Sequence, residues 1–296
     1  MKYSLMILSM ILGMCSFCCG SEADIDLQKT QSLNLTSVGN ARELGGYPVA
    51  DGRTVKHSVL LRTAALNKIS SEDVEKLTEV YHLSVVADLR MSLEAASKPD
   101  PVIEGVKYVN LRVISEDAFK KVLDKKLEFE GSAAQRAKLI VDSGLVSFDM
   151  YVKFLAEESG KKAYREFFEE LLNLQPERSL LFHCSQGKDR TGCAAMLILS
   201  ALGASEETIL KDFLLTNVFN ADLIAEQRKM LLSNGIKESE LERYMIILDE
   251  VNPKTMNVLL SWLKENYGSP VGYIIKELGI TEDEIETLKS KFLEGK

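Results

Sequence analysis

The feature of this chain that most constrains its fold is a short apolar run that leads, through a compact polar loop, into a long apolar stretch. The run covers 179–182, the loop covers 184–190, and small and apolar residues follow from Thr191 onward. Such a short apolar run is typical of a strand buried on both faces, whereas the longer stretch is typical of a buried helix. We therefore expect a strand–loop–helix unit, which is the building block of α/β folds.

The same alternation of short and long apolar segments continues along the chain. Further strands are predicted at 58–61, 83–89 and 106–113. Helices are predicted to start near Ser70 and to cover 162–174, 193–201, 206–215, 224–232, 238–248, 255–267 and 282–292. This pattern predicts an α/β domain with a mainly parallel central sheet flanked by helices and with a helical C-terminal half. Residues 115–157, placed before the last strand, are a candidate inserted cap.

Composition excludes several function classes. The 296 residues are 46% hydrophobic and 27% charged, which is ordinary for a globular protein and excludes wholesale disorder. The net charge of −8 argues against a general binder of nucleic acid or of anionic membrane surfaces. If the protein handles an anion, we expect it to do so at a local cationic site.

The N-terminal segment has the organisation of an export signal. Lys2 precedes a stretch of apolar and small residues that ends at Cys19, and polar residues begin at Ser21. We therefore expect 1–20 to be an export signal and the protein to reside in the periplasm, on the envelope or outside the cell. Lipid attachment at Cys19, as in bacterial lipoproteins, and simple cleavage near Gly20 both stay open. A lipid at Cys19 would be the only predicted link to a membrane.

The exported part of the chain is predicted to be a tether, 21–32, followed by one domain, 33–296. It retains only two cysteines, Cys184 and Cys193, which are too few for a disulfide framework. We expect Cys193 to be a core residue, with a Cys184–Cys193 disulfide under oxidation as the alternative. The aromatic stretch 148–154 is expected to be helix core rather than a lid.

The loop that opens with Cys184 has the residue types that bind and attack a phosphate group. Its backbone N–H groups and the positive end of the next helix dipole can converge on an oxyanion. Arg190 supplies a planar guanidinium for bidentate phosphate binding. The same positive field favours the thiolate of Cys184, which is the nucleophilic form. Gly187 lets the backbone turn and approach the anion closely, while His183 and Thr191 flank the cysteine as hydrogen-bonding groups.

The segment from His183 to Gly192, His-Cys-Ser-Gln-Gly-Lys-Asp-Arg-Thr-Gly, resembles the signature loop of the bacterial cysteine-dependent protein tyrosine phosphatases. Its Gly-Lys-Asp-Arg-Thr-Gly form is similar to the tyrosine and dual-specificity branch, which includes secreted enzymes that also act on phosphoinositides. Similar patterns occur at 38–47, 51–53, 61–66, 87–94 and 267–273, so the resemblance covers roughly 33–293. The family fold is a mainly parallel sheet flanked by helices, in agreement with the pattern above.

The resemblance implies a two-step hydrolysis with neither metal nor cofactor. Cys184 attacks phosphorus, Arg190 and the loop amides hold the equatorial oxygens, an aspartic acid protonates the leaving phenolate, and water hydrolyses the phosphocysteine. The Trp-Pro-Asp loop of animal enzymes is absent, because Trp262 is far from any Pro-Asp pair. The resemblance therefore implies Asp189 as the acid, with Asp88 as the alternative.

The residues carried over fall into two groups. The catalytic group is Cys184, Arg190, Asp189, Thr191 and His183, and the substrate-binding group is Ser185, Gln186, Gly187, Lys188, Asp88, Arg90 and Arg42. Lys188 either adds charge for a second phosphate, which would favour phosphoinositides, or balances Asp189. Asp88 and Arg90 could instead pair and brace the loop, and Arg42 belongs to a turn beside the mouth of the site in the family.

The expected function is thus hydrolysis of phosphotyrosine in protein substrates, with phosphoserine (dual specificity) and phosphoinositides as second candidates. The alternative is a catalytically inactive domain in which the same loop binds phosphate without hydrolysing it. Retention of Cys184 favours the enzyme, because phosphate binding alone does not require a thiol. A rhodanese-type sulfur carrier also has a cysteine loop before a helix, but that loop is usually one residue shorter.

Overall fold

The computed structural model describes residues 30–116, 135, 138, 147–245 and 248–295. The predicted export signal, 1–20, lies outside the described residues, as do most of the predicted tether, 21–32, and most of the candidate cap, 115–157. Among the helices that are described, none combines the length and the apolar character needed to cross a membrane.

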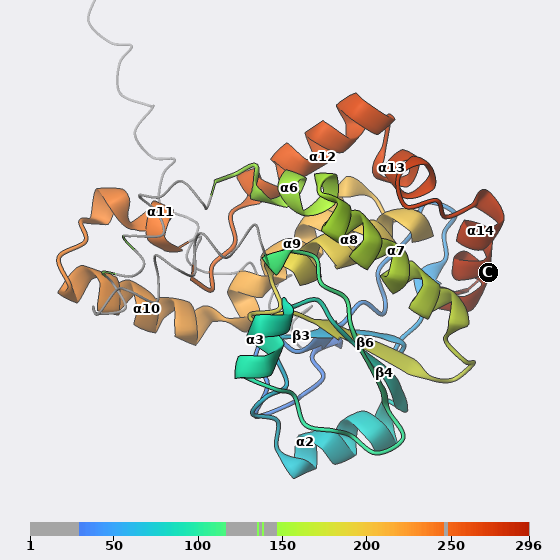
Figure 1. The fold of residues 1–296 in the computed structure, drawn as a ribbon, viewed down its shortest axis with the longest axis horizontal. Coiled ribbons are helices and arrows are strands. Elements are labelled where there is room, and N and C mark those ends of the chain that lie inside the picture. The colour runs from blue at the N-terminus through green and yellow to red at the C-terminus, as the bar shows by residue number, and fades with distance from the viewer. Residues whose placement is uncertain (1–29, 117–134, 136–137, 139–146, 246–247, 296) are drawn as a thin grey trace, which may run out of the picture.

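A five-stranded sheet forms the centre of the domain (Figure 1), with the strand order β1–β3–β6–β4–β5. These strands are β1 (Arg42–Glu43), β3 (Leu60–Thr63), β6 (Ser179–His183), β4 (Leu83–Asp88) and β5 (Lys107–Asn110). β1 runs antiparallel to β3, and every other neighbouring pair in this sheet is parallel. The prediction of a mainly parallel central sheet is therefore confirmed.

The central position of β6 explains why its sequence is a nearly uninterrupted apolar run. All five of its residues are buried, since it has a strand on each side and helices above and below. His183 is paired in register with Thr63 of β3 and with Asp88 of β4. Because parallel strands end at the same edge of a sheet, the segment that follows β6 begins between the ends of two neighbouring strands.

Helices cover both faces of the sheet. In Figure 1, α2 lies on one side of the sheet, and α7, α8, α9 and α12 lie on the other. The helices are α2 (Ser71–Glu75), continued by the wider turns of η1 (Lys76–Val80), α3 (Ser92–Ser97), α6 (Met150–Ala156), α7 (Glu158–Asn173), α8 (Asp189–Leu202), α9 (Glu206–Phe219), α10 (Ala221–Ser233), η2 (Glu238–Glu240), α11 (Leu241–Met245), α12 (Pro253–Tyr267), α13 (Pro270–Lys276) and α14 (Glu282–Phe292). α10 and α11 project beyond the end of the sheet at which α3 lies (Figure 1).

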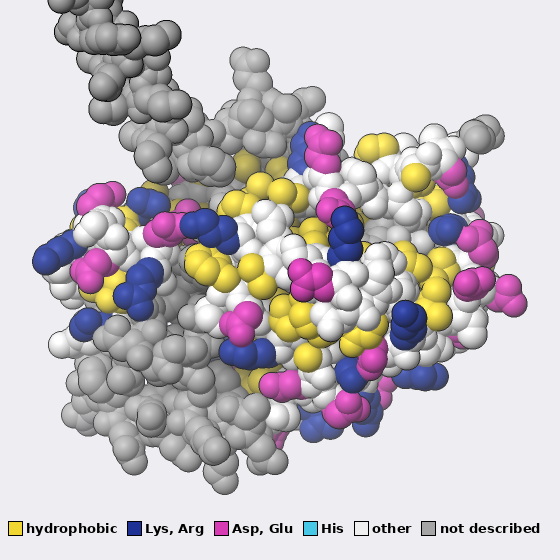
Figure 2. All heavy atoms as spheres, turned by 90° about the horizontal axis from the view of Figure 1, so that it is seen from above, with side chains coloured by type: hydrophobic (Ala, Val, Ile, Leu, Met, Phe, Trp, Pro, Cys, Tyr) yellow, Lys and Arg dark blue, Asp and Glu magenta, His cyan; other side chains and the backbone are white. Residues whose placement is uncertain are grey.

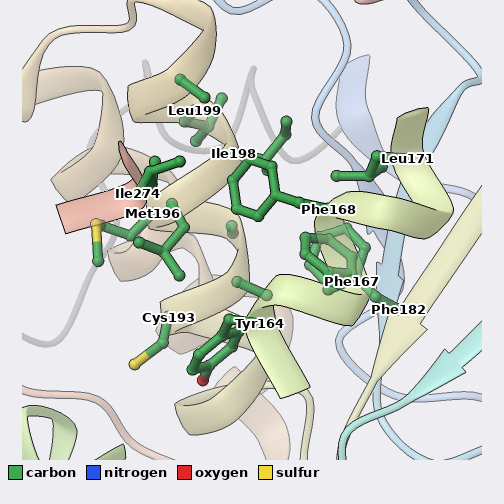
Figure 3. Packing of buried hydrophobic residues seen from close by; sticks show 14 of the residues in the cluster. Tyr164, Phe167, Phe168, Leu171, Phe182, Cys193, Met196, Ile198, Leu199 and Ile274 are labelled. Carbon is green, nitrogen blue, oxygen red and sulfur yellow. The ribbon is translucent and has the colours of Figure 1, made fainter. Parts of the chain in front are cut away.

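The main core forms between α7, α8 and the sheet (Figure 3). Every residue of α8 from Arg190 to Leu202 is buried, because α6, α7, α9, α13 and α14 all pack against it. α7 turns one aromatic face to this core, and its Phe167 ring meets Phe182 of β6 edge-on, with centroids 5.2 Å apart. Cys193 lies in the same core beside Tyr164, as the sequence predicts.

Several boundaries differ from the sequence prediction. α8 begins at Asp189 rather than near residue 193, because an acidic residue in the first turn suits the positive end of the helix dipole. β3 begins at Leu60 rather than at residue 58, since Ser58 has a positive φ of 61° that a strand does not accept. The sequence did not indicate α3, α13 or the two-residue strands β1, β2 (Thr54–Val55) and β7 (Leu293–Glu294), the last two of which pair with each other.

The described surface has mixed charge on the face that carries α12. Figure 2 shows Lys and Arg side chains interspersed with Asp and Glu over this face, and apolar groups between them. That distribution agrees with the modest net charge of −8. Binding of a phosphate group therefore depends on local cationic side chains, which the loop after β6 provides.

Candidate active site

The loop between β6 and α8, residues 184–188, lies under the N-terminus of a buried helix. Cys184 follows directly after β6 and is only 1% exposed. Arg190 and Thr191 lie in the first turn of α8, which has 14 residues. The free N–H groups and the dipole of that first turn place partial positive charge next to the cysteine.

Gly187 is at the tightest point of the loop. Its φ is +67°, a conformation that other residues rarely adopt, and a Cβ there would lie 2.3 Å from the Thr63 carbonyl oxygen. The loop therefore packs its backbone directly onto the end of β3. This contact requires glycine for two independent reasons, the backbone angle and the lack of space.

Two buried side chains hold the carbonyl groups of the loop. Asn40 Nδ2 donates to the Gln186 and Gly187 oxygens at 3.2 and 2.9 Å, and Arg62 Nη2 donates to the Gly187 oxygen at 2.9 Å. In a trans peptide the N–H points away from the C=O. Holding these two oxygens therefore turns the N–H groups of Gly187 and Lys188 the opposite way, as an anion-binding loop requires.

Arg62 belongs to a buried charge cluster behind the loop. Asp212 of α9 pairs with Arg62 and also with Arg42, whose Nε lies 3.1 Å from Asp212 Oδ1. Arg42 has no exposed surface and also donates to Asn40 Oδ1. Burial and the neighbouring charge of Arg62 lower the pKa of Arg42 to about 10. The structure thus places Arg42 behind the loop, where it supports Asn40, and not on an open surface.

Arg190 is held by a carboxylate from another element. Its Nη1 and Nη2 atoms donate to Glu94 of α3 at 2.6 and 3.1 Å, and Ser185 Oγ donates to the same carboxylate at 2.7 Å. Burial alone would raise the pKa of Glu94, but the hydrogen bonds and charge of Arg190 hold it below its ordinary value. Burial would likewise lower the pKa of Arg190, but electrostatic interaction with Cys184 and the hydrogen bonds and charge of Glu94 raise it. Arg190 therefore stays charged beside Cys184.

Asp189 is the carboxyl group nearest the loop in sequence, and it is partly accessible, with 20% of its side chain exposed. Its Oδ1 accepts hydrogen bonds from Tyr151 Oη at 2.7 Å and from Lys188 Nζ at 2.9 Å. Lys188 itself is only 2% exposed, so its ammonium group is part of the site and not a solvated surface charge.

His183, Asp88 and Arg90 belong to a second network behind the cysteine. His183 Nδ1 donates to the Cys184 carbonyl oxygen at 3.3 Å, and its Nε2 lies 3.1 Å from an oxygen of Asp100. Arg90 binds the carboxylates of Asp88 and Asp100 at 2.7 and 2.6 Å. Asp88, Asp100 and His183 lie close enough together to hold a metal ion, but the Arg90 guanidinium already supplies positive charge to both carboxylates. The network therefore braces the strand ends through ion pairs.

Asp88 is fully buried within this network. Arg90 and Tyr108 donate to its carboxylate, with Tyr108 Oη at 2.6 Å. Burial, the largest single influence, would raise the pKa of Asp88, but the hydrogen bonds and charge of Arg90, together with His183 and Tyr108, keep the pKa below its ordinary value. Asp88 is thus held as an anion, which is the wrong form for a proton donor.

Thr191 and Gln186 complete the loop. Thr191 has no exposed surface, and among the described residues its Oγ1 has no hydrogen-bond partner, which leaves this hydroxyl available to the loop. The Gln186 side chain bonds with Asp249, which precedes α12. Burial raises the pKa of Asp249 above its ordinary value. The loop is therefore tied to the C-terminal helices as well as to the sheet.

Comparison with known proteins identifies this arrangement. A model of the tyrosine phosphatase family matches residues 33–294. The chain belongs to the tyrosine phosphatase family. It is accordingly an enzyme of the protein tyrosine phosphatase class, and the fold around its cysteine loop agrees with this.

The relatives of this phosphatase include three bacterial proteins. A Cupriavidus necator protein, whose designation as a tyrosine-protein phosphatase is provisional, is 27% identical over 92% of both chains. The triple specificity protein phosphatase PtpB of Mycobacterium tuberculosis is 26% identical over 85% of this chain and 99% of its own. A tyrosine-protein phosphatase of Nostoc commune is 23% identical over 82% of this chain and 76% of its own.

The structure brings most of the sequence-predicted site residues together and adds others. Residues 183–191 form one compact unit, whereas Asp88, Arg90 and Arg42 lie behind it in buried ion pairs. Sequence reasoning missed the partners that come from distant segments, namely Asn40, Arg62, Glu94, Asp100, Tyr151, Asp212 and Asp249. Arg62 offered one signal, because a charged residue inside a buried strand needs a buried partner.

Proposed function

We propose that this phosphatase hydrolyses phosphotyrosine in proteins through a phosphocysteine formed on Cys184. One observation carries the proposal: Cys184, Arg190 and Asp189 lie on a single loop and helix start, and the buried side chains of Asn40 and Arg62 hold the carbonyl oxygens of Gln186 and Gly187 away from the anion-binding side of that loop. A dianionic phosphate in that loop meets N–H groups, a guanidinium and a thiol at once.

The first step transfers the phosphoryl group to sulfur. Cys184 Sγ attacks phosphorus as a thiolate, the S–P bond forms, and the bond from phosphorus to the tyrosine oxygen breaks. Arg190 and the loop amides bind the equatorial oxygens, whose charge they balance through the transition state. Asp189 gives its proton to the leaving phenolate.

The second step regenerates the enzyme. Water attacks phosphorus, the S–P bond breaks, and the sulfur leaves as the thiolate. Asp189, now ionised, takes the proton that the water loses, and inorganic phosphate departs. Asp189 is favoured over Asp88 for both proton transfers, because 20% of its side chain is exposed, whereas Asp88 is fully buried in an ion pair.

Phosphoinositides are second candidate substrates. Lys188, buried at the loop and bonded to Asp189, could supply charge to a second phosphate. The name of the mycobacterial relative, a triple specificity phosphatase, also favours a broad range of phosphate esters. A panel of a phosphotyrosine peptide, a phosphoserine peptide and phosphoinositide vesicles would rank these classes by kcat/KM.

The activity is tested with the purified chain, Cys184→Ser and Cys193→Ser. Both variants replace a buried cysteine, but only Cys184 lies in the loop. We expect phosphotyrosine hydrolysis to disappear in Cys184→Ser and to persist in Cys193→Ser. Absence of turnover in the unaltered chain, combined with stabilisation by phosphate, would instead support the phosphate-binding module.

We further propose that the enzyme is exported through residues 1–20, with Cys19 as the lipid acceptor or Gly20 near the cleavage site. The observation behind this is the charged start, apolar stretch and polar exit of that segment. Radiolabelled fatty acid incorporated by the full chain but not by Cys19→Ala would support the lipid anchor. A soluble periplasmic product that lacks the segment would support cleavage, and a cytoplasmic full-length product would contradict export.

A further inference from the structure

A tyrosine from a distant helix contacts the proposed acid. Tyr151 of α6 donates from its Oη to Asp189 Oδ1 at 2.7 Å, although 38 positions separate the two residues in the chain. The Tyr151 side chain is only 2% exposed. Its ring stacks on Phe154, with centroids 5.8 Å apart, and meets Phe213 edge-on at 5.9 Å. This packing fixes the direction from which the hydroxyl approaches the carboxyl group.

Both donors to Asp189 use the same oxygen. Lys188 Nζ also donates to Oδ1, at 2.9 Å, and within the described part of the chain Oδ2 accepts no hydrogen bond. When two donors occupy the lone pairs of one carboxyl oxygen, a proton on that carboxyl is carried by the other oxygen. The arrangement therefore selects Oδ2 as the oxygen that holds and releases the proton.

Tyr151 can act only as a donor in this arrangement. Burial and then the charge of Asp189 raise its pKa well above the ordinary value, so the hydroxyl remains protonated throughout the working range of an enzyme. Lys188 alone constrains the direction of the carboxyl group less, because its ammonium is a compact charge with three equivalent donors, whereas the packed Tyr151 ring presents a single O–H.

We propose that Tyr151 is a positioning residue that holds Asp189 so that Oδ2 faces the leaving oxygen of the substrate. The proposal rests on the function proposed above, in which Asp189 is the proton donor, and it assigns a role in the phenol-releasing step to a helix that precedes the last strand of the central sheet. The proposal also predicts that the effect of Tyr151 depends on the substrate. Only an ester of a weakly acidic alcohol or phenol, which is a poor leaving group, needs a well-aligned proton donor.

The expected signature is a dependence on the leaving group. Tyr151→Phe keeps the ring and removes only the hydroxyl. We expect its kcat/KM to fall about tenfold for phenyl phosphate, as part of the hundredfold or more that general acid catalysis contributes. For an aryl phosphate with a strongly acidic phenol we expect little change. The plot of log kcat/KM against leaving-group pKa therefore becomes steeper than that of the unaltered enzyme.

The chain offers a matched control that contacts the same helix. Tyr273 of α13 is also buried, and its hydroxyl donates to the Leu155 carbonyl oxygen of α6 at 2.7 Å. Tyr273→Phe thus removes a buried tyrosine hydrogen bond to α6 without touching Asp189, and its slope should equal that of the unaltered enzyme. In an Asp189→Asn background, Tyr151→Phe should produce no further steepening.

The comparison of substrates within one preparation separates positioning from folding. A partly unfolded sample lowers kcat/KM for every substrate equally and leaves the slope unchanged. An unchanged slope in Tyr151→Phe, or the same steepening in Tyr273→Phe, would overturn the positioning role while leaving the proposed function intact. Activity that persists in Cys184→Ser would instead overturn the function and the positioning role together.

Discussion

Replacing Gly187 by alanine tests whether the loop really rests its backbone on the end of β3. At φ +67° an alanine costs about 1 to 2 kcal/mol, because its Cβ approaches the neighbouring carbonyl oxygen. The added Cβ would also lie 2.3 Å from the Thr63 oxygen, 2.5 Å from the Thr63 carbonyl carbon and 2.7 Å from the Ala64 nitrogen. All three atoms belong to the backbone, so overpacking adds about 1 to 3 kcal/mol. The total loss of unfolding free energy is about 2 to 5 kcal/mol.

Gly203, at the end of α8, provides the control. Its φ is +91°, but a Cβ there would meet nothing within 4 Å, so Gly203→Ala should cost only about 1 to 2 kcal/mol. Urea unfolding measures both losses, and kcat/KM on an aryl phosphate measures the effect on the loop. We expect Gly187→Ala to lose more stability and nearly all activity, while Gly203→Ala remains active. Equal stability losses together with equal activity would refute the close contact between the loop and β3.

Two further predictions concern ion pairs. Asp212→Ala leaves the buried guanidinium groups of Arg42 and Arg62 without their carboxylate, so urea unfolding should show an unfolding free energy lower by about 3 to 5 kcal/mol. Asp222 is exposed, so Asp222→Ala is the control. A loss in Asp212→Ala no larger than that in Asp222→Ala would contradict the buried cluster. In the folded protein Glu94 has a pKa below its ordinary value. Its pairing with Arg190 therefore stabilises the fold fully at pH values above the unfolded-state pKa, which is about 4.3. This stabilisation is lost as the pH falls through the lower folded-state pKa. The difference in unfolding free energy between the unaltered enzyme and Glu94→Gln should therefore be largest near neutral pH and shrink in acid, whereas a difference that does not change with pH would contradict the ion pair.

Sequence reasoning could reach the loop because its chemistry is local. Residues 183–192 carry the nucleophile, the guanidinium and the helix start in one continuous segment, and β6 is visible as a buried strand. The central sheet follows from the same apolar runs, so its mainly parallel character was predictable.

The partners of the loop could not be predicted in the same way. Glu94 binds a residue 96 positions later, and Arg62 pairs with Asp212 across 150 positions. Nothing in the local pattern around these residues specifies the other member of the pair, because the pairing arises from tertiary packing. Tyr151 looked like a core residue from its spacing, and it is one, but its hydroxyl reaches Asp189 only because α6 packs on α8.

The central claim, that Cys184 carries the phosphoryl group during turnover, can be tested by trapping the intermediate. The enzyme is mixed with a phosphotyrosine peptide, quenched within the first turnovers, digested and analysed by mass spectrometry. We predict that the mass of one phosphoryl group appears on the peptide that contains Cys184 and that it is absent after Cys184→Ser. A phosphoryl group on a different residue, or hydrolysis that continues in Cys184→Ser, would contradict the account.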